Sequence, residues 1–365
     1  MKINEIINCL EKLAHPSLQE GYDNAGLITG NAANICSGII CTLDATEAVI
    51  QEAVEKKCNL VVAHHPIVFS GLKKINGKNY VERTIIAAIK NDIAIYAIHT
   101  NLDNILSGVN GKIAAKLGLQ NITTLAPKDN LLKKIYTFVP IAYAEQVRNA
   151  LFEAGAGDIS RYTECSFSNT GIGTFQAGAG AHPFVGELGI RHVEEEMKLE
   201  VIFPTWLQPQ IMAALKKAHP YEEVAYDIVS LTNSFAETGS GVIGYLPAPM
   251  QEKEFLLWLK TIFQVPVVRH TAFTGKPIQK VVVCGGAGSF LTFKALGAGA
   301  DAFITADLKY HEFFDADGGL LLADVGHYES EQFTIELLQE YLAQNFPTFA
   351  VLKTGVKTNP VLYFE

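Results

Sequence analysis

Two adjacent histidines, His64 and His65, stand at the end of an apolar run that begins at Val61, and Pro66 follows them. An apolar run bounded by turn signals is typical of an interior strand of a parallel sheet, where functional groups gather beyond the carboxyl ends of the strands. Imidazole is a common ligand of divalent metal ions. Because successive side chains of an extended backbone point to opposite sides, adjacent histidines suit two neighbouring ions better than one. A packed or solvated pair is the alternative, and further ligands must decide.

Further candidate ligands also follow apolar runs. The run at residues 93–98 leads into the polar segment 99–104, and the run at 320–323 leads into 324–331. The resulting set holds three imidazoles and two carboxylates, namely His64, His65, Asp103, His327 and Glu331. Two ions that share bridging carboxylates use such a set efficiently, and paired ions about 3.5 to 4 Å apart are a recurring hydrolytic device. Ligation by N and O without thiolate fits zinc, manganese, iron or cobalt. Polar residues that merely cap strands are the alternative interpretation.

Other polar residues near these strand ends have candidate supporting roles. We expect His99 and Asp324 to orient the ligands by hydrogen bonds. His99 and His311 are candidate proton shuttles near neutral pH. Lys309 and the glycine-rich turn that begins at Gly285 are candidates for binding a phosphate group, although the turn contains neither a Walker pattern nor a complete dinucleotide-binding pattern.

Length and composition indicate an ordinary globular protein. The chain has 365 residues, of which 48% are hydrophobic and 18% charged, which is enough for two or three domains. A formal charge of -9 argues against a general affinity for nucleic acid. The six cysteines form no CxxC pair, so neither a thiolate zinc site nor a disulfide framework is indicated, and a cytoplasmic location is expected. No signal peptide and no apolar run of about 20 residues is present, so we expect no membrane association.

The elements that must position the ligands form two α/β regions. Residues 3–13 have the period of a helix, and residues 38–66 read as a β-α-β unit. A helix at 81–90 and the run at 93–98 repeat this plan, and in a doubly wound sheet the carboxyl ends of such strands share one edge. After about residue 237 the α/β pattern of the first region returns, with predicted strands at 281–284, 302–304 and 320–323. A helix is predicted at 333–342, with Ser330 as its N-cap.

Residues 131–233 follow a different pattern. Two similar halves, each a strand followed by a helix, predict a duplicated β-α-β unit of the ferredoxin-like split type. The sequence therefore predicts core residues 1–130, an inserted domain at 131–233, and core residues 234–365. Within the insert, residues 182–183 and 219–223 (HPYEE) are interpreted as loop residues, with a small-molecule pocket as the alternative.

Five segments resemble the NIF-three-like family of dinuclear metal-centre proteins, known in many bacteria as GTP cyclohydrolase I type 2 homologues. They are residues 22–27 (YDNAGL), 63–66 (AHHP), 99–103 (HTNLD), 305–311 (TADLKYH) and 327–331 (HYESE). Tyr22 departs from the family's usual tryptophan and keeps an aromatic ring there. The resemblance implies that His64, His65, Asp103, His327 and Glu331 hold two divalent ions, zinc first among the candidates, with Glu331 as the bridge.

The resemblance also implies an architecture. It predicts two similar α/β halves that form one core domain, a toroidal homohexamer, and an inserted ferredoxin-like α+β domain similar to the PII and CutA folds.

Three functional hypotheses follow. The first is a metal-dependent hydrolase that activates water for attack on a purine nucleotide such as GTP. The second is a dinuclear phosphodiesterase or phosphatase, because the same ions serve in-line displacement. The third is a non-catalytic metal-binding scaffold or regulator whose insert senses a ligand or partner.

Overall fold

The computed structural model describes residues 1–364, and the chain divides into two compact units. Residues 1–126 form the first unit together with the residues from 237 onward, and residues 127–236 form the second. The architecture is mixed α/β with three sheets, two of which belong to the first unit.

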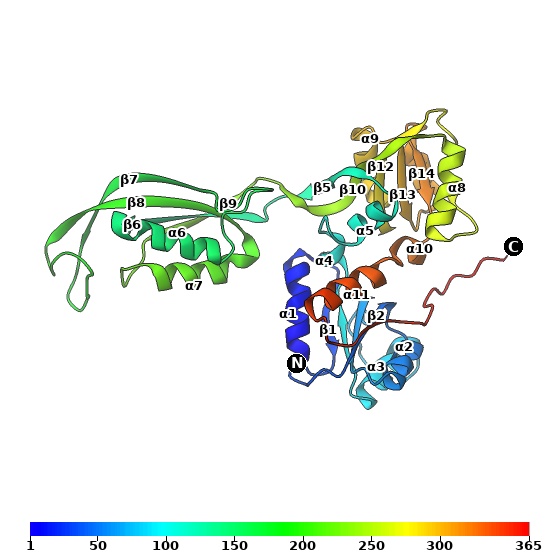
Figure 1. Cartoon of the computed structure of the whole chain (residues 1–365), viewed down its shortest axis with the longest axis horizontal. Helices are drawn as coiled ribbons and strands as arrows, with labels where there is room; N and C mark the ends of the chain where they lie inside the picture. The colour runs from blue at the N-terminus through cyan, green and yellow to red at the C-terminus, as the bar shows by residue number, and fades with distance from the viewer. Residues whose placement is uncertain (365) are drawn as a thin grey trace. The chain divides into compact units, whose positions relative to one another are not determined.

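The first sheet has the strand order β1-β4-β3-β2-β15 (Figure 1). Its neighbours β15, β2, β3 and β4 run parallel, and β1 pairs antiparallel with β4 at the edge. The central strands β2 and β3 are almost wholly buried and apolar, as expected for parallel strands covered on both faces. The bounds are β1 (Gly26–Thr29), β2 (Ile39–Asp44), β3 (Leu60–His65), β4 (Ala94–Ala97) and β15 (Val351–Lys353).

Alternation along β3 explains how this sheet is covered on both faces. Leu60 and Val62 join the cluster that contains the apolar face of α1, whereas Val61 and Ala63 join the cluster that contains α2 and α3. The helices of this region are α1 (Ile3–Leu13), α2 (Glu47–Glu55), α3 (Tyr80–Lys90), α4 (Thr100–Asp103) and α5 (Val109–Lys116), with a 3-10 turn η1 (Pro16–Leu18).

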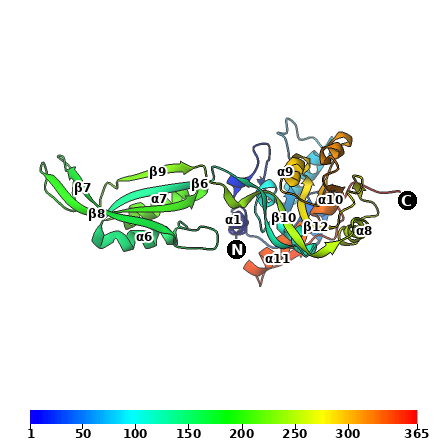
Figure 2. The ribbon, with the colours of Figure 1, turned by 90° about the horizontal axis from the view of Figure 1, so that it is seen from above.

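The second sheet has the order β11-β14-β13-β12-β10-β5. Its strands β12, β13 and β14 run parallel, and β10 lies antiparallel beside β12 (Figure 2). The strands are β5 (Gln120–Lys128), β10 (Phe235–Met250), β11 (Arg269–His270), β12 (Ile278–Ala287), β13 (Ala302–Ala306) and β14 (Leu321–Asp324). The helices are α8 (Glu252–Phe263), α9 (Thr292–Gly297), α10 (His327–Glu331) and α11 (Thr334–Asn345), with 3-10 turns η4 (Ser289–Leu291) and η5 (Tyr310–Ala316).

The second unit has the element order β-α-β-β-α-β and the sheet order β7-β8-β6-β9. All its strand pairs are antiparallel, and α6 and α7 lie along one face of the sheet (Figure 1). The elements are β6 (Leu132–Pro140), α6 (Ala144–Glu153), β7 (Ser166–Gln176), β8 (Arg191–Pro204), α7 (Gln208–Ala218) and β9 (Tyr226–Leu231), with 3-10 turns η2 (Ile141–Tyr143) and η3 (Thr205–Leu207).

The carboxyl ends of β3 and β4 share one edge of the first sheet, as the sequence predicts. β14 is the exception, because it belongs to the second sheet, and its carboxyl end meets that of β3 because both sheets pack into one continuous core. The ligands are therefore brought together by sheet packing. No helix within the described residues has both the length and the apolar character that a membrane crossing requires.

Candidate metal centre

The candidate ligands come from three places in the first unit. His64 and His65 end β3, where His65 lies in register with Asp44 at the end of β2. Asp103 is the last residue of α4, the single helical turn that follows His99. His327 and Glu331 begin and end the short helix α10, so their spacing of four residues puts both side chains on one helical face.

Glu331 lies at the centre of the group. Its Oε2 is 2.9 Å from Nε2 of His65 and 3.0 Å from Nε2 of His327. Its Oε1 is 3.9 Å from Nε2 of His64. The glutamate is only 3% exposed, and His65 and His327 are the imidazoles at hydrogen-bond distance from it.

His64 and Asp103 form the other side of the group. Nε2 of His64 lies 3.6 Å from Oδ1 of Asp103, too far for a hydrogen bond between them. Both atoms are buried, and neither has a hydrogen-bond partner among the described residues. A buried polar atom without a partner destabilises a folded protein, and a cation between these two atoms would give both a partner. This donor set therefore fits a bound metal ion.

The outer nitrogen of each histidine is fixed by a hydrogen bond. Nδ1 of His64 donates to the carbonyl oxygen of Ile98 at 2.9 Å. Nδ1 of His65 lies 2.8 Å from Oδ1 of Asp44, and Nδ1 of His327 lies 2.7 Å from Oδ2 of Asp307. This arrangement presents every Nε2 to the centre, as in proteins whose metal-binding histidines are oriented by carboxylates and carbonyls.

Within residues 1–364, three groups of side chains have ligand atoms close enough to hold a metal ion. They are His65, His327 and Glu331; His64, Asp103 and Glu331; and His64, His65 and His99. In each group the ligand atoms lie within 4.8 Å of one another. Glu331 belongs to the first two groups, which places it where a bridging ligand would lie.

The charged groups of the centre shift one another's pKa values. Burial alone would raise the pKa of Glu331, but hydrogen bonds with His327 and His65 outweigh it and hold this pKa well below its usual range. Burial lowers the pKa of His65, yet hydrogen bonds with Asp44 and Glu331 outweigh it and raise the value to about 9. For Asp103, burial and the nearby charge of Glu331 both raise the pKa. The buried carboxylate of Glu331 and the half-buried carboxylate of Asp103 thus favour positive charge around them.

His99 lies next to this centre. Its ring is 5.2 Å from that of His64 and 5.3 Å from that of His65, and its Nδ1 is 2.8 Å from Oδ1 of Asp23. Burial would raise the pKa of Asp23, but hydrogen bonds with His99 and Thr100 outweigh it and lower the value to about 2. Asp23 is therefore an anion that fixes the orientation of His99.

The glycine-rich turn at Gly285 supports Glu331. The N–H groups of Gly285, Gly286 and Gly288 donate to side chains of the first unit, namely Asn110, Ser330 and Thr305. These donors are already used by side chains of the protein, so they are not free to bind phosphate as the sequence predicts. Gly286 has φ +62°, and an ideal Cβ there would lie 2.4 Å from Oε1 of Glu331. The turn therefore makes room for the carboxylate.

The other predicted residues lie outside the three groups. His311 is exposed and its ring contacts those of Tyr310 and Phe314. Lys309 is exposed, and its N–H donates to Glu312. Asp324 accepts from the N–H of Gly326 and from Arg269, so it shapes the turn that leads to His327 and does not contact an imidazole of the centre.

Ser330 is not the N-cap that the sequence predicts. It lies inside α10, where its Oγ donates to the carbonyl oxygen of His327 and accepts from the N–H of Gly286. Phe333 occupies the N-cap position of α11. The polar residues after β14 thus form a helix of their own.

Sequence reasoning missed the partners that orient the imidazoles, Asp23, Asp44 and Asp307. Asp44 follows an apolar strand as His65 does, and Asp23 and Asp307 lie inside the motifs at 22–27 and 305–311. The sequence therefore places these aspartates near the candidate ligands, but the ring that each one contacts depends on how the two sheets pack.

A protein-family model described as Duf34/NIF3 (NGG1p interacting factor 3) matches residues 1–360. A relative from Bacillus subtilis called GTP cyclohydrolase 1 type 2 homolog is 41% identical over 326 residues, covering 89% of this chain and 87% of the relative. A relative of the same name from Halalkalibacterium halodurans is 39% identical over 363 residues, covering 98% of both chains.

Solved structures agree over the whole chain. A Bacillus cereus protein related to NIF3 superposes with a TM-score of 0.88 at 37% identity and covers 100% of this chain and 99% of its own. A Staphylococcus aureus protein gives a TM-score of 0.79 at 27% identity, with the same coverage. The family resemblance predicted from the five segments is confirmed.

Proposed function

Because this chain belongs to the Duf34/NIF3 family, we propose that it is a divalent-metal-dependent hydrolase that acts on a purine nucleotide. The observation that carries the proposal is the convergence of imidazole Nε2 atoms on the buried Glu331, next to the unpartnered atoms of His64 and Asp103. The ligands in this proposal are those predicted from the sequence, namely His64, His65, Asp103, His327 and Glu331.

The proposal includes two ions per chain. Two of the three ligand groups share Glu331 and otherwise use different residues, which supports a bridged pair. Ligation by imidazole and carboxylate fits zinc, with manganese, iron and cobalt as alternatives. When bound, such a pair activates water and neutralises charge that develops during hydrolysis.

His99 is the proposed proton acceptor. Its Nδ1 is held by Asp23, so Nε2 is free to take a proton near His64 and His65. The carboxylate of Asp23 stabilises the imidazolium that results. His311 stays a second candidate, in contact with solvent.

Aromatic rings beside His99 support a planar substrate. The ring of Phe69 is 6.1 Å from that of His99, and the ring of Tyr22 is 6.5 Å from that of Phe69. Both rings are more than half exposed, at 53% and 67%, so their faces are available for stacking on a purine. The name shared by the curated relatives supports the same class of substrate.

Assembly, location and the insert belong to the same proposal. The element order β-α-β-β-α-β of the second unit supports a domain similar to the PII and CutA folds. A homohexamer follows from the family resemblance, and cysteine usage supports a cytoplasmic location.

The test compares metal-loaded and chelated protein with GTP as substrate, following the ultraviolet spectrum of the purine and the release of phosphate. A spectral change that needs metal and is lost in His65→Ala supports the proposal, and His182→Ala, which removes an exposed imidazole of the second unit, is the matched control. Phosphate release without a spectral change would instead make the protein a phosphatase. Tight metal binding without turnover would favour the scaffold hypothesis.

A further inference from the structure

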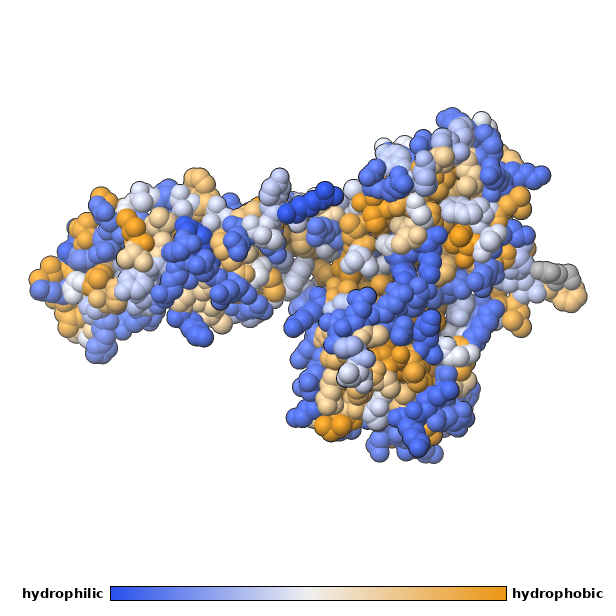
Figure 3. All heavy atoms as spheres, in the orientation of Figure 1, coloured by the Kyte–Doolittle hydropathy of each residue, from blue (hydrophilic) through white to orange (hydrophobic). Residues whose placement is uncertain are grey.

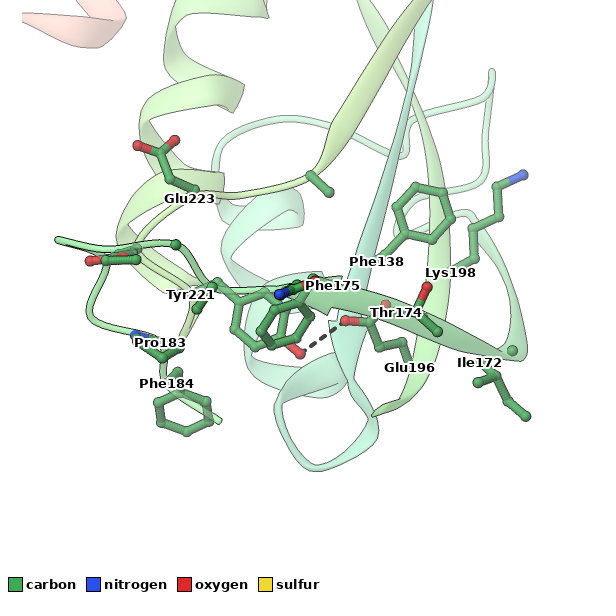
Figure 4. A pocket seen from close by; sticks show the side chains of 18 of the residues that line it. Phe138, Ile172, Thr174, Phe175, Pro183, Phe184, Glu196, Lys198, Tyr221 and Glu223 are labelled. Carbon is green, nitrogen blue, oxygen red and sulfur yellow. Dashed lines mark hydrogen bonds between the residues drawn. The ribbon is translucent and has the colours of Figure 1, made fainter. Parts of the chain in front are cut away.

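The second unit contains a cavity of about 600 Å³ that no candidate ligand of the metal centre lines. This volume lies in the range of small-molecule binding sites. The cavity is formed by β7 and β8 together with the segments at 181–184 and 221–225, as Figure 4 shows. Residues that the sequence marked as loop or pocket candidates therefore line a cavity, including Pro183, Tyr221, Glu222 and Glu223.

One wall of the cavity is aromatic. The ring of Tyr221 lies near two phenylalanine rings, with centroids 6.0 Å from that of Phe175 and 6.3 Å from that of Phe184. Phe138 adds a fourth ring to the lining. Such faces carry negative electrostatic potential and attract organic cations.

A buried carboxylate lies beside this wall. Glu196 is only 9% exposed, and its Oε1 accepts a hydrogen bond of 2.9 Å from the hydroxyl of Tyr221, drawn as a dashed line in Figure 4. Its Oε2 lies against Gly173, where an ideal Cβ would come within 2.2 Å of it. Gly173 therefore leaves room for the carboxylate at the cavity wall.

The charge of the lining is negative. Three glutamates line the cavity, namely Glu196, Glu222 and Glu223, against one lysine, Lys198. The ammonium of Lys198 is already engaged, because it donates to Glu200 at 2.9 Å and lies 4.3 Å from the centre of the Tyr136 ring. With no arginine in the lining, a phosphate or carboxylate ligand would find little to bind it.

Two histidines fix the wall from outside the cavity. His219 donates from Nε2 to the carbonyl oxygen of Phe138 and accepts at Nδ1 from the N–H of Tyr221. The backbone N–H of His182 donates to Glu222 and thereby joins the two lining segments. The cavity is therefore held in shape by its own hydrogen bonds before any ligand enters.

We propose that this cavity binds a small organic cation, an ammonium on an aromatic or alkyl body, with the ammonium against Glu196 and the body against Phe175, Tyr221 and Phe184. The acidic lining selects the charge, and the aromatic wall and the volume select the body. The site is separate from the proposed hydrolase centre and does not depend on it.

A charge series on one molecular frame tests the proposal with the full-length protein. The probes are 2-phenylethylammonium, the neutral 2-phenylethanol and the anion 3-phenylpropionate, each titrated by calorimetry. We expect the cation to bind at least about tenfold more tightly than the other two. A neutral or anionic probe that binds as well as the cation, or a cation that does not bind at about 10 mM, would overturn the proposal.

Two glutamine variants locate the binding. Glu196→Gln keeps the shape of the side chain and removes its charge, so it should weaken binding of 2-phenylethylammonium about tenfold. Glu195→Gln is the matched control, because Glu195 is exposed on the same strand and does not line the cavity. Equal binding by both variants would place the cation elsewhere and contradict the assignment. The charge series on the unmodified protein stays decisive even if Glu196→Gln folds poorly.

Discussion

Oε2 of Glu331 lies 2.9 Å from Nε2 of His65, although 266 positions separate the two residues in the chain. His65 ends β3 of the first sheet, and Glu331 ends α10, which follows β14 of the second sheet. The centre therefore exists only when both sheets are folded and packed together. A metal ion bound there would bind the native state alone and would stabilise it.

The shared position of Glu331 predicts different metal contents for different variants. Asp103→Ala removes a ligand from one group only and His327→Ala from the other, so each should keep about half of the bound metal. Glu331→Ala removes the residue common to both groups and should lose nearly all of it. Metal analysis of the purified variants by mass spectrometry measures the ratios. Equal losses in all three variants would contradict a bridged pair.

The carboxylates that orient the imidazoles should tune metal affinity. Asp44→Asn and Asp307→Asn each replace a charged acceptor of an Nδ1–H group by a neutral one, at His65 and His327 respectively. Loss of such partners lowers metal affinity by about 10-fold to 100-fold in other proteins, and we expect a similar effect here. Competition with a fluorescent chelator measures it.

The control for this experiment is Asp158→Asn, which removes an exposed carboxylate of the second unit. Its metal affinity should equal that of the unmodified protein. If Asp44→Asn and Asp307→Asn behaved like this control, the two aspartates would not act on the metal ligands.

Much of the candidate site could be predicted from local pattern. The apolar runs before His64 and Asp324 mark buried strands, and ligand groups follow the ends of such strands. The distribution of the strands over two sheets could not be predicted in the same way, because the apolar pattern of a buried strand is the same in either sheet.

Two predictions that the structure contradicts, the phosphate-binding turn and the Ser330 N-cap, failed for the same physical reason. The sequence gives no sign that the N–H groups of Gly285 and Gly286 have hydrogen-bond partners, but in the fold they donate to Asn110 and Ser330. Ser330 looks like an N-cap because serine favours that position, and a separate helix of five residues takes it instead. In both cases a tertiary contact overrides a local preference.

Gly286 gives a test of the space around Glu331. Gly286→Ala would place a Cβ 2.4 Å from Oε1 of Glu331 at a backbone φ of +62°, so it should destabilise the protein by about 1 to 3 kcal/mol and lower metal content. Thermal unfolding and metal analysis measure the two effects.

Gly297→Ala is the matched control for that substitution. Gly297 ends α9, and an added Cβ meets no atom within 4 Å. The change should leave metal content unaltered and leave stability equal or up to about 1 kcal/mol higher. Similar metal loss in both variants would mean that crowding of Glu331 is not the cause.

Glu336 predicts a pH dependence of stability away from the metal centre. Hydrogen bonds with Lys116 and Lys112 of α5 lower the pKa of this α11 carboxylate to about 2. A lowered pKa in the folded state means that the ion pairs stabilise the protein above the ordinary glutamate pKa near 4.5, and that this contribution disappears as the pH falls toward 2. Because Glu336 is partly exposed, solvent limits the contribution to less than about 1 kcal/mol.

Glu336→Gln should therefore be less stable than the unmodified protein at pH 7, and the difference in free energy of unfolding should shrink steadily below pH 4.5. Urea unfolding at several pH values and low salt measures the difference. Glu55→Gln is the control, because the carboxylate of Glu55 is exposed and accepts from the neutral Gln51. Lowering the pH protonates Glu336 and so removes the charge that the lysines would stabilise. If the difference for Glu336→Gln stayed constant down to pH 2, the lysines would not stabilise the glutamate charge.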